Sequence, residues 1–389
     1  MARRERDRGS KRAAGQAPRG GRARPASRVP PGRPVHPASP AASPAVSPAV
    51  SPARRQGLGG LVDPSWGAIS YPQGGFTAQD FAAFVDNLIE AGSHEHYVDA
   101  ALYDYEYRRR RADVTFYREL ARRRGADRIL ELGAGSGRVT VPLARDGRRV
   151  VAVDRSPEML TRLGARIARL PAAAAARITP VAGDLRSFSV DGRFPLAIAA
   201  FNVLEHLYTR DEVTACLQRI AAHLAPGGAF AFDVQLPDFA WLTRDSSRRW
   251  AKTRFTDPTT GRAMYYSTNH DYDPVSQIAL IRLYYEPADE PAGQIAPRRR
   301  PGGRDDRAAD TRGLDDRAAD TRGVDARVVQ LSQRKFFPAE LEALVAHAGF
   351  RVTERYGDFS FRPLDGSAES QVLVCEPAPG QGRSRTVSR

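Results

Sequence analysis

Cysteine and long apolar runs are scarce in this chain, and their scarcity excludes several classes of protein. The 389 residues include two cysteines, Cys216 and Cys375, each within an apolar pattern. We expect both to be reduced core residues, with no disulfide framework and no metal site. No apolar run approaches the roughly 20 residues of a membrane span. No apolar segment follows the Arg-rich start, so a secretory signal is not expected and a cytoplasmic protein is the simplest interpretation.

A concentrated basic charge is also missing from the middle of the chain. The net charge is +14, but residues 1–60 contain 13 Arg or Lys and two acids, and residues 378–389 add three Arg. Residues 61–377 are therefore close to neutral. They lack the basic footprint of a nucleic-acid-binding domain, so a nucleic-acid partner is not expected for this part.

Two kinds of segment have the composition of disordered chain. Residues 1–60 are rich in Arg, Pro, Ala and Ser, and we interpret them as a disordered basic tail that is either solvated or binds a polyanion. The ten-residue unit "RDDRAADTRG" at 304–313 recurs as "LDDRAADTRG", which indicates an expanded loop over 300–324. Residues 378–389 are predicted to be a second disordered tail.

Between these segments, apolar strands alternate with helical patterns. "RILEL" (128–132), "RVVAVD" (149–154), "PLAIAAF" (195–201) and "GAFAFDV" (228–234) are typical of buried strands. A helix is expected over 113–124, with Asp113 as its N-cap, and another over 211–225. This alternation predicts an α/β fold with a parallel sheet and helices on both faces. We assign 61–125 to an N-terminal helical cap and 126–235 to the core.

The alternation stops after residue 235. Residues 263–286 are aromatic and β-branched with a turn between them, which predicts a strand pair. We interpret 236–335 as an inserted antiparallel β-lid that includes the repeat loop. Residues 336–377 then supply a helix opened by Pro338 and the last two strands of the core.

The stretch "ILELGAGSGR" (129–138) places three glycines at alternate positions after a buried strand. Gly133, Gly135 and Gly137 allow a ligand to approach the backbone and permit positive φ. The spacing is G-x-G-x-G rather than the G-x-G-x-x-G of dinucleotide folds. Glu131 would repel a pyrophosphate but suits a cationic amino-acid group. The loop therefore favours S-adenosylmethionine over a nicotinamide cofactor.

Five blocks in this order resemble the class I S-adenosylmethionine-dependent methyltransferases, of the type that acts on small molecules. They are "ELGAGSGR", "VVAVDRSPEML", "VAGDLRSF", "FNVLEHL" and "HLAPGGAFAFDV". The resemblance covers about 61–377 apart from the repeat loop. It implies a Rossmann-like seven-stranded sheet with S-adenosylmethionine bound at the Gly-rich loop.

The resemblance also implies roles for individual residues in cofactor binding. Asp154 would accept hydrogen bonds from the ribose hydroxyls, although a helix N-terminal charge is the alternative. Asp184 would bind the adenine amino group beside the Leu185 N–H, unless it is a plain turn aspartate. The carbonyl of Phe201, at the end of the fourth strand, would meet the methionine amine.

Catalytic candidates come from two further segments. "YDYEY" (103–107) resembles a segment that caps the cofactor in small-molecule methyltransferases, so Tyr105 or its neighbours Tyr103 and Tyr107 would reach the cofactor or the acceptor. Packing is the alternative for these aromatics. His206 follows the fourth strand and is a candidate base with the ordinary histidine pKa of about 6.5, unless it only packs at the rim.

The expected function is methyl transfer to the nitrogen or oxygen of a small molecule. The chain has "FNVL" where relatives that methylate base amino groups carry an Asn/Asp-Pro-Pro-aromatic block, and it has no Pro-Cys nucleophile. The aromatic segments 103–107 and 264–273 are expected to enclose the acceptor from opposite sides. Two alternatives remain: an RNA or protein methyltransferase anchored by the basic tail, and a non-catalytic cofactor-binding protein of the same fold.

Overall fold

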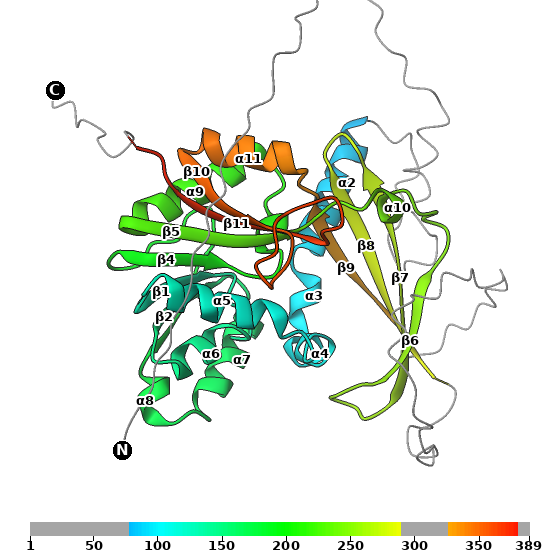
Figure 1. The fold of residues 1–389 in the computed structure, drawn as a ribbon. Coiled ribbons are helices and arrows are strands. Elements are labelled where there is room, and N and C mark those ends of the chain that lie inside the picture. The colour runs from blue at the N-terminus through cyan, green and yellow to red at the C-terminus, as the bar shows by residue number, and fades with distance from the viewer. Residues whose placement is uncertain (1–77, 289–325, 380–389) are drawn as a thin grey trace, which may run out of the picture. The chain divides into compact units, whose positions relative to one another are not determined.

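The computed structural model describes residues 78–288 and 326–379, all within one compact unit of the chain (Figure 1). The predicted tail over 1–60, the first part of the cap (61–77), the repeat loop over 300–324 and residues 380–389 lie outside the described residues. None of the described helices is both long enough and apolar enough to cross a membrane.

Seven strands form the larger sheet, in the order β10-β11-β5-β4-β1-β2-β3. The pairs among β1 to β5 are parallel, whereas β11 runs antiparallel to both β5 and β10. The predicted α/β fold with a seven-stranded sheet is therefore confirmed, although the sheet is mixed rather than parallel throughout. Its strands are β1 (Arg128–Leu132), β2 (Arg149–Asp154), β3 (Ile178–Ala182), β4 (Phe194–Ala199), β5 (Leu224–Gln235), β10 (Phe350–Tyr356) and β11 (Ser370–Pro377).

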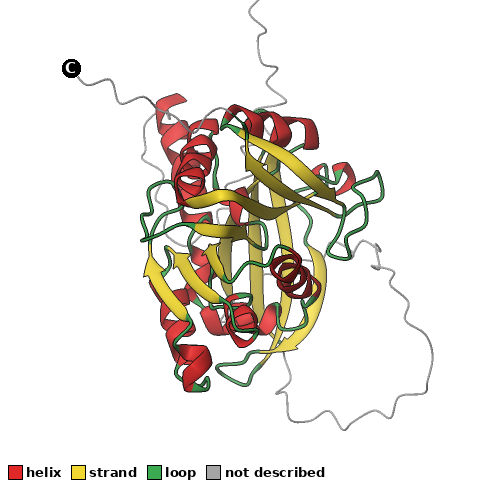
Figure 2. Cartoon of the chain, turned by 60° about the vertical axis from the view of Figure 1, so that its left-hand side comes forward, coloured by secondary structure: helices red, strands yellow, loops and turns green. Residues whose placement is uncertain are grey.

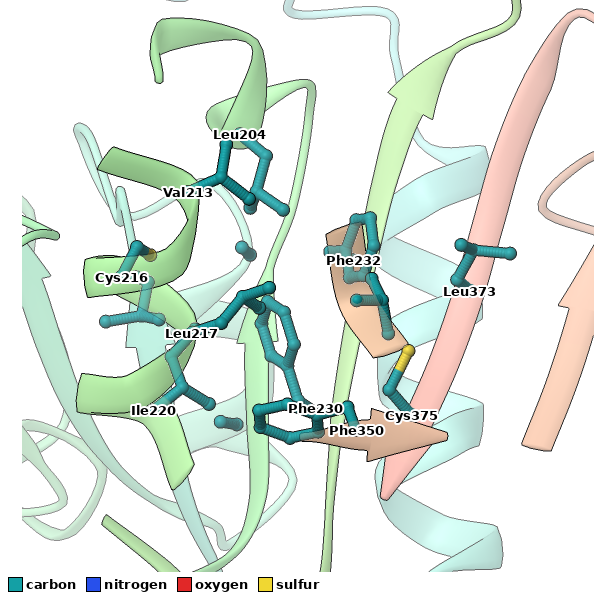
Figure 3. Packing of buried hydrophobic residues seen from close by; sticks show 14 of the residues in the cluster. Leu204, Val213, Cys216, Leu217, Ile220, Phe230, Phe232, Phe350, Leu373 and Cys375 are labelled. Carbon is teal, nitrogen blue, oxygen red and sulfur yellow. The ribbon is translucent and has the colours of Figure 1, made fainter. Parts of the chain in front are cut away.

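Helices cover both faces of this sheet because alternate strand residues point to opposite sides. One core packs Leu130 and Leu132 of β1 against α9 (Arg210–His223) and α11 (Pro338–His347). The other packs Ile129 against α5 (Ala112–Arg123), α6 (Thr140–Arg145) and α7 (Pro157–Ile167), with the short α8 (Ala172–Ala175) before β3. Figure 3 shows Cys216 and Cys375 inside the first core, where both are free and buried, as predicted.

A separate antiparallel sheet has the order β6-β7-β8-β9. The strand pair expected over 263–286 is the hairpin of β7 (Ala263–Asp273) and β8 (Ile278–Pro287). β6 (Trp250–Thr256) and β9 (Arg327–Arg334) flank it, and α10 (Phe239–Leu242) precedes it. An apolar cluster on this sheet includes Leu331 of β9 and Leu102 from the N-terminal helices. We call this sheet the lid.

Helices from the N-terminal part of the described chain join the two sheets. They are α2 (Ala78–Gly92), α3 (Glu95–Val98) and α4 (Ala100–Glu106). α3 contacts both α7 of the core and β9 of the lid, and α4 contacts α7. Figures 1 and 2 show the two sheets from different sides. The N-terminal helices therefore cover the edge of the core where a ligand is expected.

The predicted N-cap of α5 is wrong. The residue at that position is Arg111, and Asp113 lies inside the first turn. Asp113 is fully buried and accepts hydrogen bonds from two nitrogens of Arg138, at 2.8 and 2.6 Å. The Asp113 carboxylate, which the sequence pattern assigned to capping, therefore forms an ion pair between α5 and the end of the Gly-rich loop.

Candidate active site

The Gly-rich loop connects β1 to α6 and has positive φ at all three glycines. A Cβ at Gly133, where φ is +63°, would lie 2.5 Å from the Val203 side chain. A Cβ at Gly137 would lie 2.4 Å from Leu163 of α7. Gly135 has more room, since the nearest atom to its Cβ position is the Met159 sulfur at 4.0 Å. Gly133 and Gly135 line a cavity, whereas Gly137 serves the packing of α7.

Glu131 lies beneath this loop. Its side chain is 2 % exposed and accepts a hydrogen bond from Thr140 Oγ1 at 2.7 Å. Burial raises the pKa of this carboxyl to about 7. Glu131 is not among the residues that line the cavity, so the expectation that it faces a cationic ligand group is not met in this geometry. Its contact holds the first turn of α6 against β1.

Asp154, at the end of β2, faces the same cavity. Its Oδ2 accepts from the Gly135 N–H at 2.7 Å, and its Oδ1 accepts from the Ser156 N–H at 2.9 Å. Burial raises its pKa, and the two backbone N–H groups oppose that shift. Each carboxylate oxygen has a second lone pair, so Asp154 can still accept hydrogen bonds from a ligand.

The turn after β3 contributes Gly183 and Leu185 to the cavity, and Met159 of α7 lies on the same wall. Asp184 is placed differently. It forms a bidentate ion pair with Arg186, with bonds of 2.8 and 2.6 Å, and it also accepts from the Arg186 N–H. Arg186 lowers its pKa. Asp184 is not a lining residue of the cavity in this structure, and its side chain is held by Arg186 outside that lining.

The end of β4 has a strained backbone. Phe201 and Asn202 have φ values of +73° and +60°, a region that L-residues rarely adopt. Asp233 of β5 holds this turn, because it accepts from the Phe201 N–H at 2.8 Å and from the Asn202 N–H at 3.3 Å. Tyr117 donates to Asp233 at 2.6 Å. Strain of this kind costs about 1–3 kcal/mol per residue and concentrates at functional sites.

Aromatic residues of α3 and α4 cover the cavity. The rings of Tyr103 and Tyr107 lie 4.7 Å apart, as residues one helical turn apart should, and both rings approach Phe201. Tyr97 of α3 packs against Tyr103. Tyr105 is on the other side of α4, where its ring packs against Phe255 and beneath the Arg108 guanidinium. The structure therefore places Tyr103 and Tyr107, not Tyr105, where an aromatic cap was expected.

His206 lies in the 3-10 helix η1 (Val203–His206) and also lines the cavity. Burial lowers its pKa to about 3, so the ring is neutral at physiological pH and the ordinary histidine pKa assumed from the sequence is wrong. Burial also raises the pKa of Tyr97 well above its usual value, so its hydroxyl stays protonated. Tyr97 Oη lies 2.6 Å from His206 Nε2, and the direction of this hydrogen bond follows from the partners of the other ring nitrogen.

The Ile89 carbonyl, which only accepts, fixes the direction of a chain of hydrogen bonds. Ser332 Oγ of β9 donates to this carbonyl at 2.8 Å and therefore accepts from the Tyr208 hydroxyl at 2.6 Å. Because Tyr208 uses its proton in that bond, the neutral His206 ring donates from Nδ1 to Tyr208 Oη at 3.3 Å, and Nε2 accepts from the Tyr97 hydroxyl. The Tyr97 oxygen is left with lone pairs only, so toward a ligand it can act as an acceptor.

Two cavities meet at this aromatic cover. The inner cavity is the one described above, between the Gly-rich loop, Asp154, Leu185 and His206. The outer cavity has a volume of about 620 Å³ and lies among α3, the residues after α4, the end of β5, β9 and the loop after β10. Tyr97, Tyr103 and Phe201 line both. These three residues form the part of the lining that the two described cavities share.

Comparison with known proteins identifies the family of the core. Residues 129–228 match a family model described as a methyltransferase domain. A Streptomyces protein named cypemycin N-terminal methyltransferase is 37% identical over 109 residues, which are 28% of this chain and 42% of that protein. The CcbJ methyltransferase from Streptomyces caelestis superposes with a TM-score of 0.51 at 26% identity, over 69% of this chain and 94% of that chain. The chain contains a class I methyltransferase domain.

The methyltransferase fold extends beyond the matched segment. An S-adenosylmethionine-dependent methyltransferase from Clostridium acetobutylicum superposes with a TM-score of 0.52 at 15% identity, over 72% of this chain and 97% of that chain, and so shares the fold. The match to the cypemycin N-terminal methyltransferase spans less than half of that relative's length. Family and fold thus agree with the resemblance drawn from the five sequence blocks.

Sequence reasoning missed several residues of the methyltransferase site. Tyr97 was overlooked because "HEHYV" has no helical periodicity and no motif, and its place is set by packing of α3 on α7 and β9. The lid residues were sought in β7, but Leu331 and Gln333 of β9 line the outer cavity instead. Gln235 and the segments 357–359 and 369–370 were missed too, since only the assembled sheet brings them there.

Proposed function

We propose that this protein is a methyltransferase that binds S-adenosylmethionine in the inner cavity and methylates the nitrogen of a small molecule in the outer cavity. The observation that carries the proposal is the wall of Tyr97, Tyr103 and Phe201, which both cavities share. The outer cavity is within the usual range of about 300–1,000 Å³ for a small-molecule site. Its lining includes polar side chains that can orient a ligand.

The residues of the inner cavity fit the chemistry of the cofactor. Gly133 and Gly135 leave room for a ligand against the backbone, and a side chain at Gly133 would have none. Asp154 offers its remaining lone pairs to the ribose hydroxyls, as the family resemblance implies. Leu185 and Met159 supply an apolar wall for the adenine ring. The Phe201 carbonyl, at the strained end of β4, remains the proposed partner of the methionine amine.

Alignment is the main contribution that this site can make to the reaction. When bound, S-adenosylmethionine supplies an electrophilic methyl group on sulfur. Placing an acceptor in line with that group can contribute on the order of 7–11 kcal/mol. The shared wall would restrict the direction of approach, because Tyr103 and Phe201, whose rings are in contact, line both cavities.

Tyr97 and His206 favour an amine that arrives with its lone pair free. Since the Tyr97 hydroxyl donates to His206, the Tyr97 oxygen accepts from an N–H of the acceptor and orients the nitrogen. His206, with a pKa of about 3, is a weak base and is poorly suited to deprotonate a hydroxyl. An amine needs no such step before it attacks. The name of the cypemycin relative, an N-terminal methyltransferase, also supports an amine acceptor.

The test is methyl transfer from isotope-labelled S-adenosylmethionine to a cell metabolite extract, followed by mass spectrometry. The expected result is a labelled small amine that appears with the wild type and not with Gly133→Val. If the label appears only in the RNA or protein fraction, the small-molecule assignment is wrong. If the protein binds the cofactor but labels nothing in any fraction, a non-catalytic binding protein replaces the proposed enzyme.

A further inference from the structure

One buried lysine controls the orientation of two glutamines in the outer cavity. Lys335 follows β9, is 1 % exposed, and forms an ion pair with the fully buried Glu205 of η1 at 2.7 Å. Its ammonium also donates to Gln235 Oε1 at 2.9 Å and to Gln333 Oε1 at 3.0 Å. The three N–H bonds of Lys335 are thus all used, and no acceptor function exists on an ammonium group.

The lysine determines which way each amide faces. Because the ammonium only donates, both glutamines must turn their carbonyl oxygens toward it. Their NH₂ groups are then directed away from Lys335, and both side chains line the outer cavity. Within 78–288 and 326–379 neither NH₂ group donates to a protein atom. This wall therefore presents two free hydrogen-bond donors to whatever enters.

The side chains of Gln235 and Gln333 are held in place by hydrogen bonds that join the core to the lid. Glu205 Oε1 accepts from the backbone N–H of Gln235 at 2.8 Å, so the same carboxylate that pairs with Lys335 also fixes the end of β5. Trp241 lies beside the ammonium, with its ring centre 5.4 Å from Nζ. Donors preorganised in this way lose little entropy when a ligand binds.

We infer that the outer cavity selects amines that also carry a carbonyl oxygen, which the NH₂ groups of Gln235 and Gln333 bind. Lys335 acts as a positioning residue, because it prevents the two amides from presenting their oxygens instead. The inference names the substrate class of the proposed methyltransferase and so rests on that function. An amine without a suitably placed acceptor oxygen would form neither of these hydrogen bonds and would gain none of their contribution to binding.

Binding to the protein loaded with S-adenosylhomocysteine tests this selectivity without any need for turnover. The probes are alaninamide and the alkylamine of the same shape in which isopropyl replaces the amide group. With two added hydrogen bonds, alaninamide is expected to bind about 10-fold more tightly in calorimetry or ligand-observed NMR, when each affinity is referred to the free-base form of the amine. Equal affinity for the two probes, or binding of neither, would overturn the inference.

The variants Gln235→Glu and Gln333→Glu make the test specific. Each keeps an oxygen toward Lys335 but replaces the NH₂ donor with a second oxygen, so the preference for alaninamide should disappear in the double variant. Gln218→Glu, on the exposed side of α9, makes the same change outside every described cavity and should keep the preference. A preference that survives in the double variant would refute the role of the two amides.

Lys335→Met tests the positioning role itself. Here both glutamines remain but are free to rotate, so the preference should fall although the NH₂ groups are still present. Because this change leaves Glu205 buried without its partner, the melting temperature must be measured alongside, and the glutamine variants decide the question if it unfolds. A wild type that prefers alaninamide but transfers no methyl group would contradict the proposed function and leave the selectivity intact.

Discussion

The two cavities differ in how far apart in the chain their walls originate. Apart from residues within 93–103, the inner cavity is built from 133–206, where the ends of successive strands are followed closely by residues that line it. The outer cavity combines residues near 96–112, 201–202, 235, 331–333, 357–359 and 369–370. The cofactor end therefore depends on local turns, whereas the acceptor end depends on how the lid and the last strands assemble.

Because of this difference, substitutions in the two cavities should have different effects. A substitution in β9 or in the loop after β10 can alter the outer cavity without touching the Gly-rich loop. Only Tyr97, Tyr103 and Phe201 belong to both walls, so changes there should affect cofactor and acceptor together. A substitution of an outer-cavity residue other than these three that abolishes cofactor binding would contradict this comparison.

The largest effect is expected for Gly133→Val in the inner cavity. The added side chain meets Val203 at 2.5 Å and must adopt a φ of +63°. Clash and strain together should weaken binding of S-adenosylhomocysteine roughly 100-fold or more in calorimetry. Gly125→Val is the matched control, because φ is +58° there but a Cβ meets nothing within 4 Å. If both variants lost affinity to a comparable extent, the cause would be general backbone strain rather than a clash in the inner cavity.

Asp154→Ala should give the next largest effect. Loss of hydrogen bonds to a charged group corresponds to a weakening of cofactor binding by about 10- to 150-fold. Asp127→Ala, which removes the exposed ion pair with Arg149, serves as the control and should leave affinity unchanged. An Asp154→Ala variant that binds the cofactor normally would remove this residue from the site.

His206→Ala sharpens the comparison beside the shared wall, because His206 lines only the inner cavity and is bonded to Tyr97. The variant should turn over about 10-fold more slowly, because Tyr97 loses the bond that orients it, while cofactor affinity stays nearly constant. With a histidine pKa of about 3, neither protein should show a step in turnover near pH 6.5 that belongs to this residue. A step in the wild type that His206→Ala removes would restore His206 as a conventional base.

Glu131→Gln should have the smallest effect on the ligand and a measurable one on stability. The folded pKa of about 7 lies above the ordinary value of 4.5, so the folded state binds the proton more tightly than the unfolded chain. The wild type therefore loses stability as the pH rises from 4.5 through 7, by up to about 3 kcal/mol. Glu131→Gln should lack this loss, so urea unfolding at pH 5 and pH 8 should show the variant gaining on the wild type.

The control for that experiment is Glu90→Gln, an exposed carboxylate on α2. It should leave the difference in stability between pH 5 and pH 8 as in the wild type. Cofactor affinity of Glu131→Gln should stay within about threefold of wild type, since the side chain contacts Thr140 rather than the cavity. A large loss of affinity would return Glu131 to the ligand.

The sequence predicted the fold well because the strands of the core are buried on both faces and read as continuous apolar runs. β1 and β2 have the predicted bounds, and the hairpin of β7 and β8 lies where its aromatic pattern indicated. Gly133, Gly135 and Asp154 could also be predicted from the sequence. A turn that brings the backbone close to a ligand needs glycine, and the last side chain of the neighbouring strand lies beside that turn.

The rest of the site could not be derived in this way. Asp113 and Asp184 look like a cap and a ligand residue in sequence, but arginines distant or adjacent in the chain pair with them. Tyr105 and Tyr103 are indistinguishable until the phase of α4 against the core is known. Gln235, Gln333 and Lys335 come from separate elements, and only the docking of the lid brings them together.

The most direct test of the account is a crystal structure of the protein with S-adenosylhomocysteine. The account predicts the ligand in the inner cavity, with Asp154 on the ribose and the thioether sulfur facing the outer cavity between Tyr97, Tyr103 and Phe201. A ligand bound elsewhere, or one whose sulfur faces away from these three residues, would contradict the claim that methyl transfer occurs across the shared wall.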